Sequence, residues 1–208
     1  MNLKDIKTAA QAYCDRYDDE MESVMPAFVR VVEGKINNAL RTGDQAIRSQ
    51  IYLERENEYY GLPSDWGGAR DVEILHEGQQ HGRTLVYLAP EDMNKKSRQA
   101  NGRHNYYTII ANQIQITPPS DNEILEITYY QRLPALENDT DSNWLTRKSP
   151  DAYIFGLCTE ISAFAKDPML FESYKLRFAE SLMDITMEDQ ITRWSGPSLR
   201  VQVDGLVV

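Results

Sequence analysis

Glu126-Ile-Thr-Tyr-Tyr-Gln-Arg-Leu-Pro-Ala-Leu136 is the stretch that decides the fold of this chain, because a strand pattern ends within it. Even-numbered residues from Ile124 to Tyr130 lie on one face of an extended segment, and the odd-numbered Leu125, Ile127 and Tyr129 lie on the other. Their β-branched and aromatic side chains favour a strand. Pro134 then ends the strand because it has no amide hydrogen to donate. No residue type typical of catalysis recurs here, so we interpret the stretch as architecture.

A helix is predicted to begin at residue 150, in the sequence Ser149-Pro-Asp-Ala-Tyr-Ile-Phe-Gly156. Ser149 can cap the free amides of a helix start, Pro150 fits the first helical position, and Asp151 meets the positive end of the helix dipole. We interpret residues 136–148, which contain the polar run Thr140-Asp-Ser-Asn-Trp-Leu145, as a crossover between the strand and this helix.

Two helices are also predicted before residue 46. The first repeats apolar residues at helical spacing, namely Leu3, Ile6, Ala10, Tyr13 and Tyr17. The acidic stretch Asp18-Asp-Glu-Met-Glu22 interrupts it, and we interpret this stretch as a solvated loop rather than a metal site, because it implies no fixed ligand geometry. The second helix is expected to start near Pro26 and to end at Gly43, where glycine can take the left-handed conformation.

The helical period continues after residue 150. One predicted face consists of Tyr153, Ile154, Leu157, Ile161 and Phe164. Asp167 and Pro168 are expected to cap and open a further helix. Its apolar residues are Phe171, Tyr174, Phe178, Leu182 and Ile185, with Trp194 near the end. An aromatic stripe of this kind is typical of a core or a helix–helix contact rather than a cofactor site.

Residues 46–132 change to a strand period. Tyr106–Ile110 and Gln113–Thr117 flank Ala111-Asn112 as in a hairpin, and Gly67-Gly68 is interpreted as part of a turn. Residues 91–102 are expected to hold a short helical turn and a polar loop. The basic residues Lys95, Lys96, Arg98 and Arg103 cluster there, either as a solvated loop or as a contact for a phosphate or a partner.

The patterns together predict an α+β fold. N- and C-terminal segments, residues 1–45 and 149–195, would form a helical bundle. Residues 46–135 would form an inserted β-rich domain with an antiparallel, barrel-like sheet, followed by the crossover at 136–148. Residues 196–208 would form an extended arm.

Composition narrows the class of protein. A formal net charge of −10 over 208 residues argues against general nucleic-acid binding, although an acidic wall could let DNA slide past without sticking. No apolar run approaches the length of a membrane span, and the N-terminus lacks an apolar signal core, so we expect a cytoplasmic protein without membrane contact. Cys14 and Cys158 fall at apolar positions and are interpreted as buried thiols rather than a disulfide.

Catalytic and cofactor patterns are weak. His76, His81 and His104 lack the spacing of metal ligands, and no glycine-rich phosphate loop, nucleophile elbow or zinc-protease motif is present in the sequence. Glu54, Glu56 and Glu58 alternate as on a solvated strand face, although two opposed carboxylates could cleave a glycan. We therefore expect no catalytic residue, no cofactor and no metal.

The C-terminal arm carries the candidate partner-binding residues. Apolar and polar residues alternate from residue 199, and the chain ends on apolar residues that a lone monomer has little reason to expose. The arm would fold back as an edge strand or add to a partner's sheet or pocket. The candidate contact residues are Leu199, Val201, Val203, Leu206, Val207 and Val208.

Several short motifs occur in an order that resembles the adaptor, or head-to-tail connector, proteins of tailed bacteriophages, including the tail tubular protein A type. They are Met25-Pro-Ala-Phe-Val29 with Glu33, Ile36-Asn37-Asn38-Ala39-Leu40-Arg41, Leu62-Pro-Ser-Asp65, Tyr106-Tyr-Thr108, Ile114-Gln-Ile-Thr-Pro118, Ile127-Thr-Tyr-Tyr130 through Leu133-Pro134, Asn143-Trp-Leu145 and Pro150–Gly156. The likeness covers roughly residues 22–190, and no counterpart is found for Gly67–Gly82.

This resemblance implies a structural virion protein made in the host cytoplasm and placed in the neck or tail. It implies a ring, expected to be a dodecamer, beneath the capsid portal. The ring would extend the channel for double-stranded DNA, without sequence-specific binding, and would present a platform for the nozzle or other tail proteins during ejection. Two alternatives stay open: a free-standing regulatory or chaperone-like binding module, and a cell-wall-cleaving enzyme.

Overall fold

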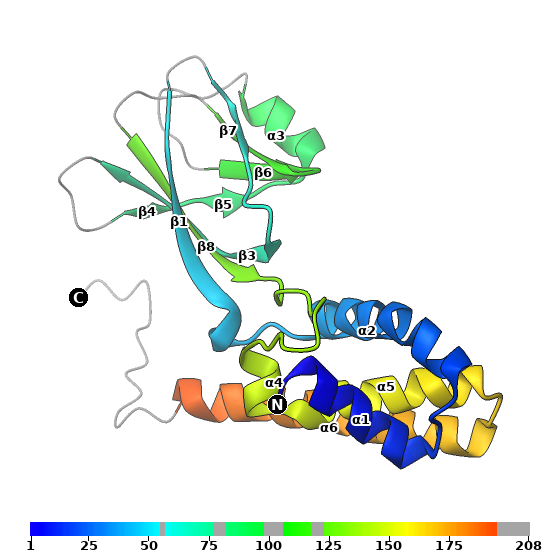
Figure 1. The fold of residues 1–208 in the computed structure, drawn as a ribbon. Helices are drawn as coiled ribbons and strands as arrows, with labels where there is room; N and C mark the ends of the chain where they lie inside the picture. Colours follow the sequence, from blue (N-terminus) through cyan, green and yellow to red (C-terminus); the bar gives the residue numbers. More distant parts are fainter. Residues whose placement is uncertain (55–56, 77–81, 98–105, 118–122, 195–208) are drawn as a thin grey trace. The chain divides into compact units, whose positions relative to one another are not determined.

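The computed structural model describes residues 1–54, 57–76, 82–97, 106–117 and 123–194, and it is an α+β protein. The chain divides into two compact units (Figure 1). One unit consists of helices from both ends of the described chain, residues 1–42 and the residues from 133 onward. The other consists of residues 43–132. The α+β class predicted from the sequence is confirmed.

The helical unit is built around α5, which is buried on most of its circumference. Helices α1, α2, α4 and α6 all contact α5 (Figure 1). The bounds are α1 Leu3–Cys14, α2 Asp19–Ala39, α4 Trp144–Lys148, α5 Pro150–Phe164 and α6 Pro168–Trp194. A helix that is apolar on nearly all sides belongs at the centre of a unit, with its neighbours covering it.

Gly156 sets how closely the helices approach α5. A Cβ atom at this position would lie 2.6 Å from Val32 Cγ1 of α2 and 3.2 Å from Phe178 Cε2 of α6. Such distances leave no room for any side chain. The absence of a side chain therefore lets α2 and α6 both press against the same turn of α5.

Helix α2 begins seven residues earlier than the sequence pattern predicts. The acidic stretch at residues 18–22 is its first turn, because the Asp18 side chain accepts a hydrogen bond from Met21 N at 3.0 Å. Asp19, Glu20 and Glu22 then face the positive end of the helix dipole. The predicted loop is therefore wrong, and Pro26 lies inside the helix rather than at its start.

Two further helix ends differ from the predictions, and a third differs only in its cap. Helix α1 stops at Cys14 because Asp15 takes the left-handed conformation, so Tyr17 lies beyond it and is exposed. Helix α2 ends at Ala39, and Gly43 instead opens the short 3-10 helix η1, Gly43–Gln45. The start of α5 at residue 150 is confirmed, but Ser149 makes no side-chain cap, because its backbone closes α4 through Leu145 O.

The other unit contains two four-stranded sheets. The first has the order β1-β8-β3-β4, with β1 Ala46–Tyr52, β8 Glu123–Gln131, β3 Trp66–His76 and β4 Arg83–Thr84. The second has the order β2-β7-β6-β5, with β2 Tyr59–Gly61, β7 Gln113–Thr117, β6 Tyr106–Ile110 and β5 Val86–Tyr87. Helix α3, Pro90–Ser97, follows β5 in the chain. All pairings are antiparallel except that of β5 with β6.

Both sheets contribute to one apolar core. Leu125, Ile127 and Tyr129 of β8 are buried in it, which confirms the predicted alternation of that strand. The hairpin formed by β6 and β7 is also confirmed, with Ala111 in the left-handed conformation at its turn. The interpretation of Gly67-Gly68 as a turn is wrong. Both lie in β3 at a bulge, where a Cβ on Gly67 would lie 2.6 Å from Tyr130 O.

Polar side chains of α2 bond the backbone of residues 133–136, where the chain enters the helical unit after β8. Glu33 Oε1 accepts a hydrogen bond from Leu136 N, and Asn37 Oδ1 accepts one from Leu133 N, both at 2.8 Å. Burial raises the pKa of the Glu33 carboxyl above its usual range, although the hydrogen bond from Leu136 opposes this shift. Glu33 therefore positions the backbone at Leu136, although burial disfavours the ionised form of its carboxyl group.

The two cysteines are free and lie against each other between α1 and α5. Cys14 Sγ lies 3.9 Å from the carbonyl oxygen of Cys158, and Cys158 Sγ lies 3.8 Å from the carbonyl oxygen of Ala10. The hydrogen bond from Cys158 lowers the pKa of the Cys14 thiol, and that same contact together with burial raises the pKa of Cys158. The interpretation as thiols agrees with the structure, although Cys14 is only half-buried.

We predict opposite effects of alanine at two helical glycines. Gly156→Ala should lower the free energy of unfolding by roughly 1–3 kcal/mol, because the new methyl group overpacks the contact with Val32. Gly34→Ala in α2 should raise it by about 0.5–1 kcal/mol, because a Cβ there meets nothing within 4 Å and alanine is the better helix former. Urea denaturation followed by circular dichroism measures both, and equal effects of the two changes would contradict the packing at Gly156.

A second prediction separates the charge of Glu33 from its hydrogen bond. Glu33→Ala should cost roughly 1–3 kcal/mol because Leu136 N loses its acceptor. Glu33→Gln keeps an oxygen acceptor without the buried charge. The pKa of Glu33 is raised in the folded protein, so ionisation of this carboxyl lowers the free energy of unfolding of the wild type as the pH rises above about 4.3. The Gln variant has no such loss, so its free energy of unfolding should rise relative to that of the wild type in this range. Denaturation at pH 4 and pH 8 tests this, and a Gln advantage that shrinks at pH 8 would refute it.

Candidate functional site

Helix α6 carries more exposed large apolar side chains than any other described helix of the helical unit. As predicted, Asp167 caps its start, because its Oδ1 accepts hydrogen bonds from Met169 N and Leu170 N, both at 3.0 Å. Its inner face packs on the unit through Tyr174, Phe178 and Ile185. This is the face that the sequence pattern identified, with Phe171 and Leu182 half-buried beside it.

The opposite face of α6 is also apolar. Its residues recur at intervals of seven, seven, four, four and three, which places them on one side of a helix. Each side chain is between 47% and 84% exposed. We call this set the outer stripe: Met169, Leu176, Met183, Met187, Ile191 and Trp194.

The outer stripe continues past the point where α6 packs on its own unit. Residues 186–194 include no buried residue, and Asp189 alone among them is half-buried. Ion pairs hold this end, from Lys148 Nζ to Glu188 at 3.4 Å and from Arg193 Nε to Asp189 at 2.8 Å. Met187, Ile191 and Trp194 are therefore carried on a helix end that packs little on its own unit.

An exposed apolar stripe of this length is typical of a contact surface for another protein. Monomeric proteins rarely expose contiguous apolar patches larger than a few hundred Å². Methionine adapts its shape to a partner, and tryptophan often supplies much of the binding energy in an interface. The stripe combines both residue types on a rigid helix, so we take it as the candidate functional site.

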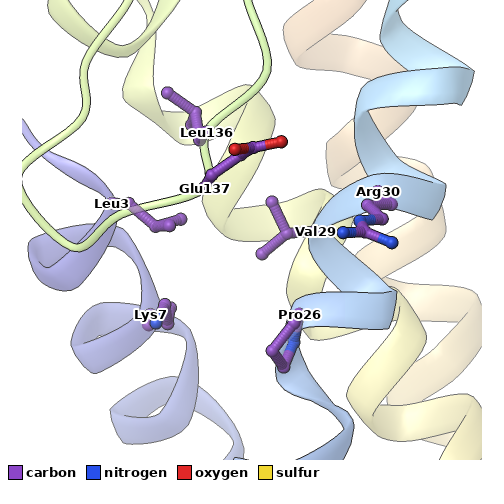
Figure 2. A pocket seen from close by; sticks show the side chains of 7 residues that line it. All are labelled: Leu3, Lys7, Pro26, Val29, Arg30, Leu136 and Glu137. Atoms are coloured by element: carbon purple, nitrogen blue, oxygen red, sulfur yellow. The ribbon is translucent and has the colours of Figure 1, made fainter.

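A cavity lies between α1, α2 and the chain at residues 136–137 (Figure 2). Its volume is about 190 Å³, and Lys7, Arg30 and Glu137 lie around it (Figure 2). Ligand pockets are usually about 300–1,000 Å³. The cavity is therefore a poor candidate for a substrate site.

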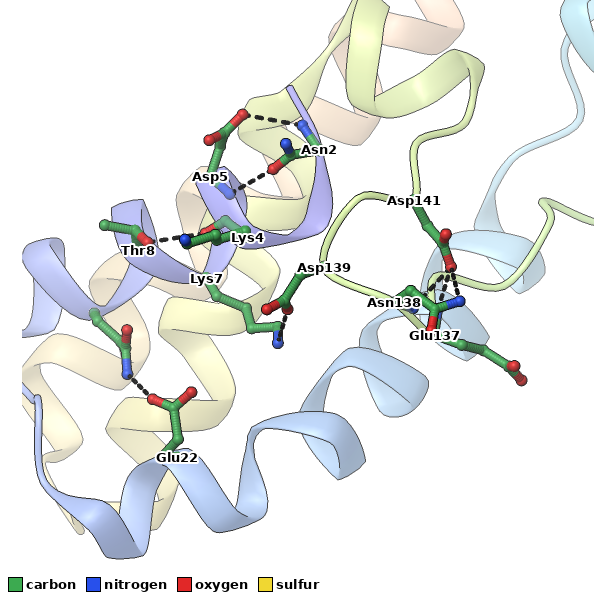
Figure 3. A network of polar contacts seen from close by, with 11 residues as sticks. Asn2, Lys4, Asp5, Lys7, Thr8, Glu22, Glu137, Asn138, Asp139 and Asp141 are labelled. Atoms are coloured by element: carbon green, nitrogen blue, oxygen red, sulfur yellow. Dashed lines mark hydrogen bonds and ion pairs between the residues drawn. The ribbon is translucent and has the colours of Figure 1, made fainter.

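A polar network beside this cavity connects α1 to residues 137–141 (Figure 3). Lys7 Nζ lies 2.7 Å from Asp139 Oδ1, and Leu3 N donates to Asp141 O at 3.0 Å. Asp141 Oδ2 accepts from the backbone amides of Glu137 and Asn138. Lys7 lowers the pKa of Asp139, and the hydrogen bond from Asn138 N, followed by that from Glu137 N, lowers the pKa of Asp141. These carboxyl groups stay ionised and bonded, so their role is structural.

The partner-binding residues predicted in the C-terminal arm lie outside the described residues, as do Arg98, Arg103, His81, His104 and Glu56. The arm comprises Leu199, Val201, Val203, Leu206, Val207 and Val208. Of the basic cluster, Lys95 Nζ pairs with Asp92 Oδ1 at 3.1 Å within α3. The contact role of the arm therefore stays a prediction.

The remaining histidine and glutamates have structural partners. His76 Nε2 lies 3.3 Å from Glu123 Oε1 at the ends of β3 and β8. Glu54 and Glu58 lie in the connection between β1 and β2, not on the predicted strand face. The Tyr60 hydroxyl bonds both the amide and the carbonyl of Glu54, at 2.7 and 3.2 Å.

Among the described residues, histidine, cysteine and carboxylate side chains form no group of three or more that could hold a metal ion. Within the same part of the chain, no helix is both long enough and apolar enough to cross a membrane.

Sequence reasoning missed the outer stripe, although a signal was present. Met169, Leu176 and Met183 repeat at intervals of seven, beside the aromatic set that was identified as the core face. Apolar residues on two opposite faces of one helix leave little difference in hydrophobicity between the faces. The aromatic face was therefore assigned to the core, and the other face was overlooked.

Among curated proteins, none matches the chain. The family model described as SU10 adaptor protein matches residues 1–202, nearly the full length. This match confirms the resemblance to bacteriophage adaptors, which are structural proteins, and the chain belongs to the SU10 adaptor protein family.

Proposed function

We propose that this chain is the subunit of an adaptor ring that joins the capsid portal to the tail and extends the DNA channel. The family match over residues 1–202 carries this proposal. The outer stripe of α6 supports it, because a subunit of an assembly needs an apolar surface that its own fold leaves exposed. The ring would lie in the neck of the virion and would be a dodecamer.

The charge of the chain suits a channel for DNA. A formal net charge of −10 repels phosphates, so double-stranded DNA could pass during ejection without sequence-specific binding. The partners in this proposal are the portal ring, neighbouring copies, and the nozzle or other tail proteins.

The division of the chain supports a modular subunit. We propose that the N- and C-terminal helices form a bundle and that the β-rich part is an inserted domain within it. The compact units, with boundaries at residues 42–43 and 132–133, are in keeping with this arrangement. The two chain connections between the units would let the β-rich domain face the tail or a neighbouring copy while the helical ends contact the portal.

The direct test mixes the purified chain with the portal of the same phage. We expect a complex with one adaptor copy per portal subunit, measured by size-exclusion chromatography with light scattering and seen as rings by electron microscopy. The chain alone is a poor indicator, because a ring subunit can stay monomeric until the portal gathers it. A well-formed portal that binds no adaptor copy would instead favour a free-standing binding module.

The C-terminal arm has its own test. Deleting residues 197–208 should abolish portal binding and leave the circular dichroism spectrum unchanged, because the apolar residues of the arm are proposed to dock on the portal. A matched pair of triple variants refines this result. Serine at Leu199, Val201 and Val203 should weaken binding, whereas alanine at Arg200, Gln202 and Asp204 should not. Portal binding that survives the deletion would rule out the arm as the contact.

A further inference from the structure

One row of residues along the exposed side of α2 lacks long side chains, and Arg30 and Lys35 lie beside it. The inner face of this helix packs on the unit through Met25, Val29, Val32 and Ile36. The outward residues recur at intervals of four, three and four, and all are exposed. We call this set the small-residue face: Ala27, Val31, Gly34 and Asn38.

Gly34 has no explanation within its own chain. A Cβ atom at this position would meet nothing within 4 Å, and Gly34 is not among the residues with a positive φ. Glycine inside a helix lowers helix stability relative to alanine. A glycine that neither packing nor conformation requires suggests that another helix approaches α2 closely here, since small residues let two helix axes come within about 8 Å.

The outer stripe has the complementary shape. Its methionine, leucine and isoleucine side chains form a ridge, and the ridge and the small-residue face both repeat at intervals near seven residues. Helices pack by inserting the large side chains of one into the spaces between residues of the other, at a crossing angle of about 20° for such repeats. The same subunit therefore carries a ridge and a matching surface on two different helices.

Along the middle of the two surfaces the flanking charges have opposite sign, although Glu20 extends the α2 row toward the acidic start of that helix. Glu172, Glu180 and Asp184 flank the outer stripe on α6, and Arg30 and Lys35 flank the small-residue face on α2. Glu172 and Lys35 each have an intrachain partner as well, namely Lys175 and Glu160. A contact between α6 and α2 of two copies would bring acidic flanks to basic flanks, whereas two stripes packed on each other would bring acidic flanks together.

We propose that the outer stripe of α6 in one copy packs on the small-residue face of α2 in the next copy. The inference rests on the proposed ring, because it assigns the contact that joins its subunits. A contact between two different surfaces is the kind that closes into a ring, whereas a twofold contact of α6 with itself stops at a dimer. Covering six large apolar side chains would bury several hundred Å², which approaches the ~800 Å² per partner of a stable complex.

Cross-linking between distinguishable copies tests the contact. A photoreactive benzoylphenylalanine replaces Met183, and the chain is mixed in equal amounts with an isotope-labelled wild-type chain. The mixture is irradiated both free at high concentration and bound to the portal. We expect cross-links from the probe to residues 19–39 of the labelled copy. Cross-links to α6, to another segment or to the portal, or no cross-link between copies in either sample, would overturn the inference.

The two failures can be told apart. If complexes with the portal form but no cross-link reaches α2 of the labelled copy, the proposed contact between α6 and α2 is wrong and the adaptor function stands. If the chain does not bind the portal, the adaptor function fails, and the cross-links in the free protein still decide the contact.

A matched glycine pair gives a second readout. Gly34→Leu should fill the small-residue face and weaken assembly on the portal by tenfold or more, the loss expected at a central interface residue, without lowering the melting temperature. Gly61→Leu in β2 is the control, because a Cβ there also meets nothing within 4 Å and no contact between copies is assigned to it. Unchanged assembly by Gly34→Leu would overturn the proposal.

Discussion

The close approach of three helices at Gly156 is the constraint on which the helical unit depends. A side chain at this position would collide with Val32 of α2, and Phe178 of α6 lies almost as near. Because α5 is buried on most sides, α2 and α6 must turn their packing faces toward it. The orientation of both helices follows, and with it the direction of their outward surfaces. Gly156 thus allows α6 to pack closely through Phe178, and the opposite side of α6 is left at the surface.

Buried polar groups then fix the path of the chain across the unit. Glu33 and Asn37 of α2 accept the amides of Leu136 and Leu133, and Asn143 donates from its Nδ2 to the Tyr153 hydroxyl at 2.8 Å. Extended chain must find partners for its amides when it is buried without a sheet. Side chains of α2, and Asp141 within the segment itself, supply acceptors for these amides, which explains why residues 133–143 hold a defined course with little secondary structure.

The strand and helix types could largely be predicted from the sequence, because β8 alternates cleanly and α5 begins at a proline with strong signals around it. The errors arose where two local signals competed. At residues 18–26, a cap and an acidic first turn outweighed a proline that would normally open a helix. At Gly67-Gly68, the glycines serve close contact with β8 rather than a turn, and only the register of the sheet shows this. The α6 surface was missed because periodicity detects one face at a time.

Two apolar faces on α6 create a problem that the charge of the chain helps to solve. The inner face stabilises the unit, while the outer stripe adds nothing to the stability of a single copy and favours association. A formal net charge of −10 makes copies repel one another and so opposes premature contact between exposed stripes. In the proposed assembly, a portal that binds each copy raises their effective concentration until local contacts outweigh this repulsion. A short-range apolar contact and a long-range repulsion together would make ring formation depend on the template.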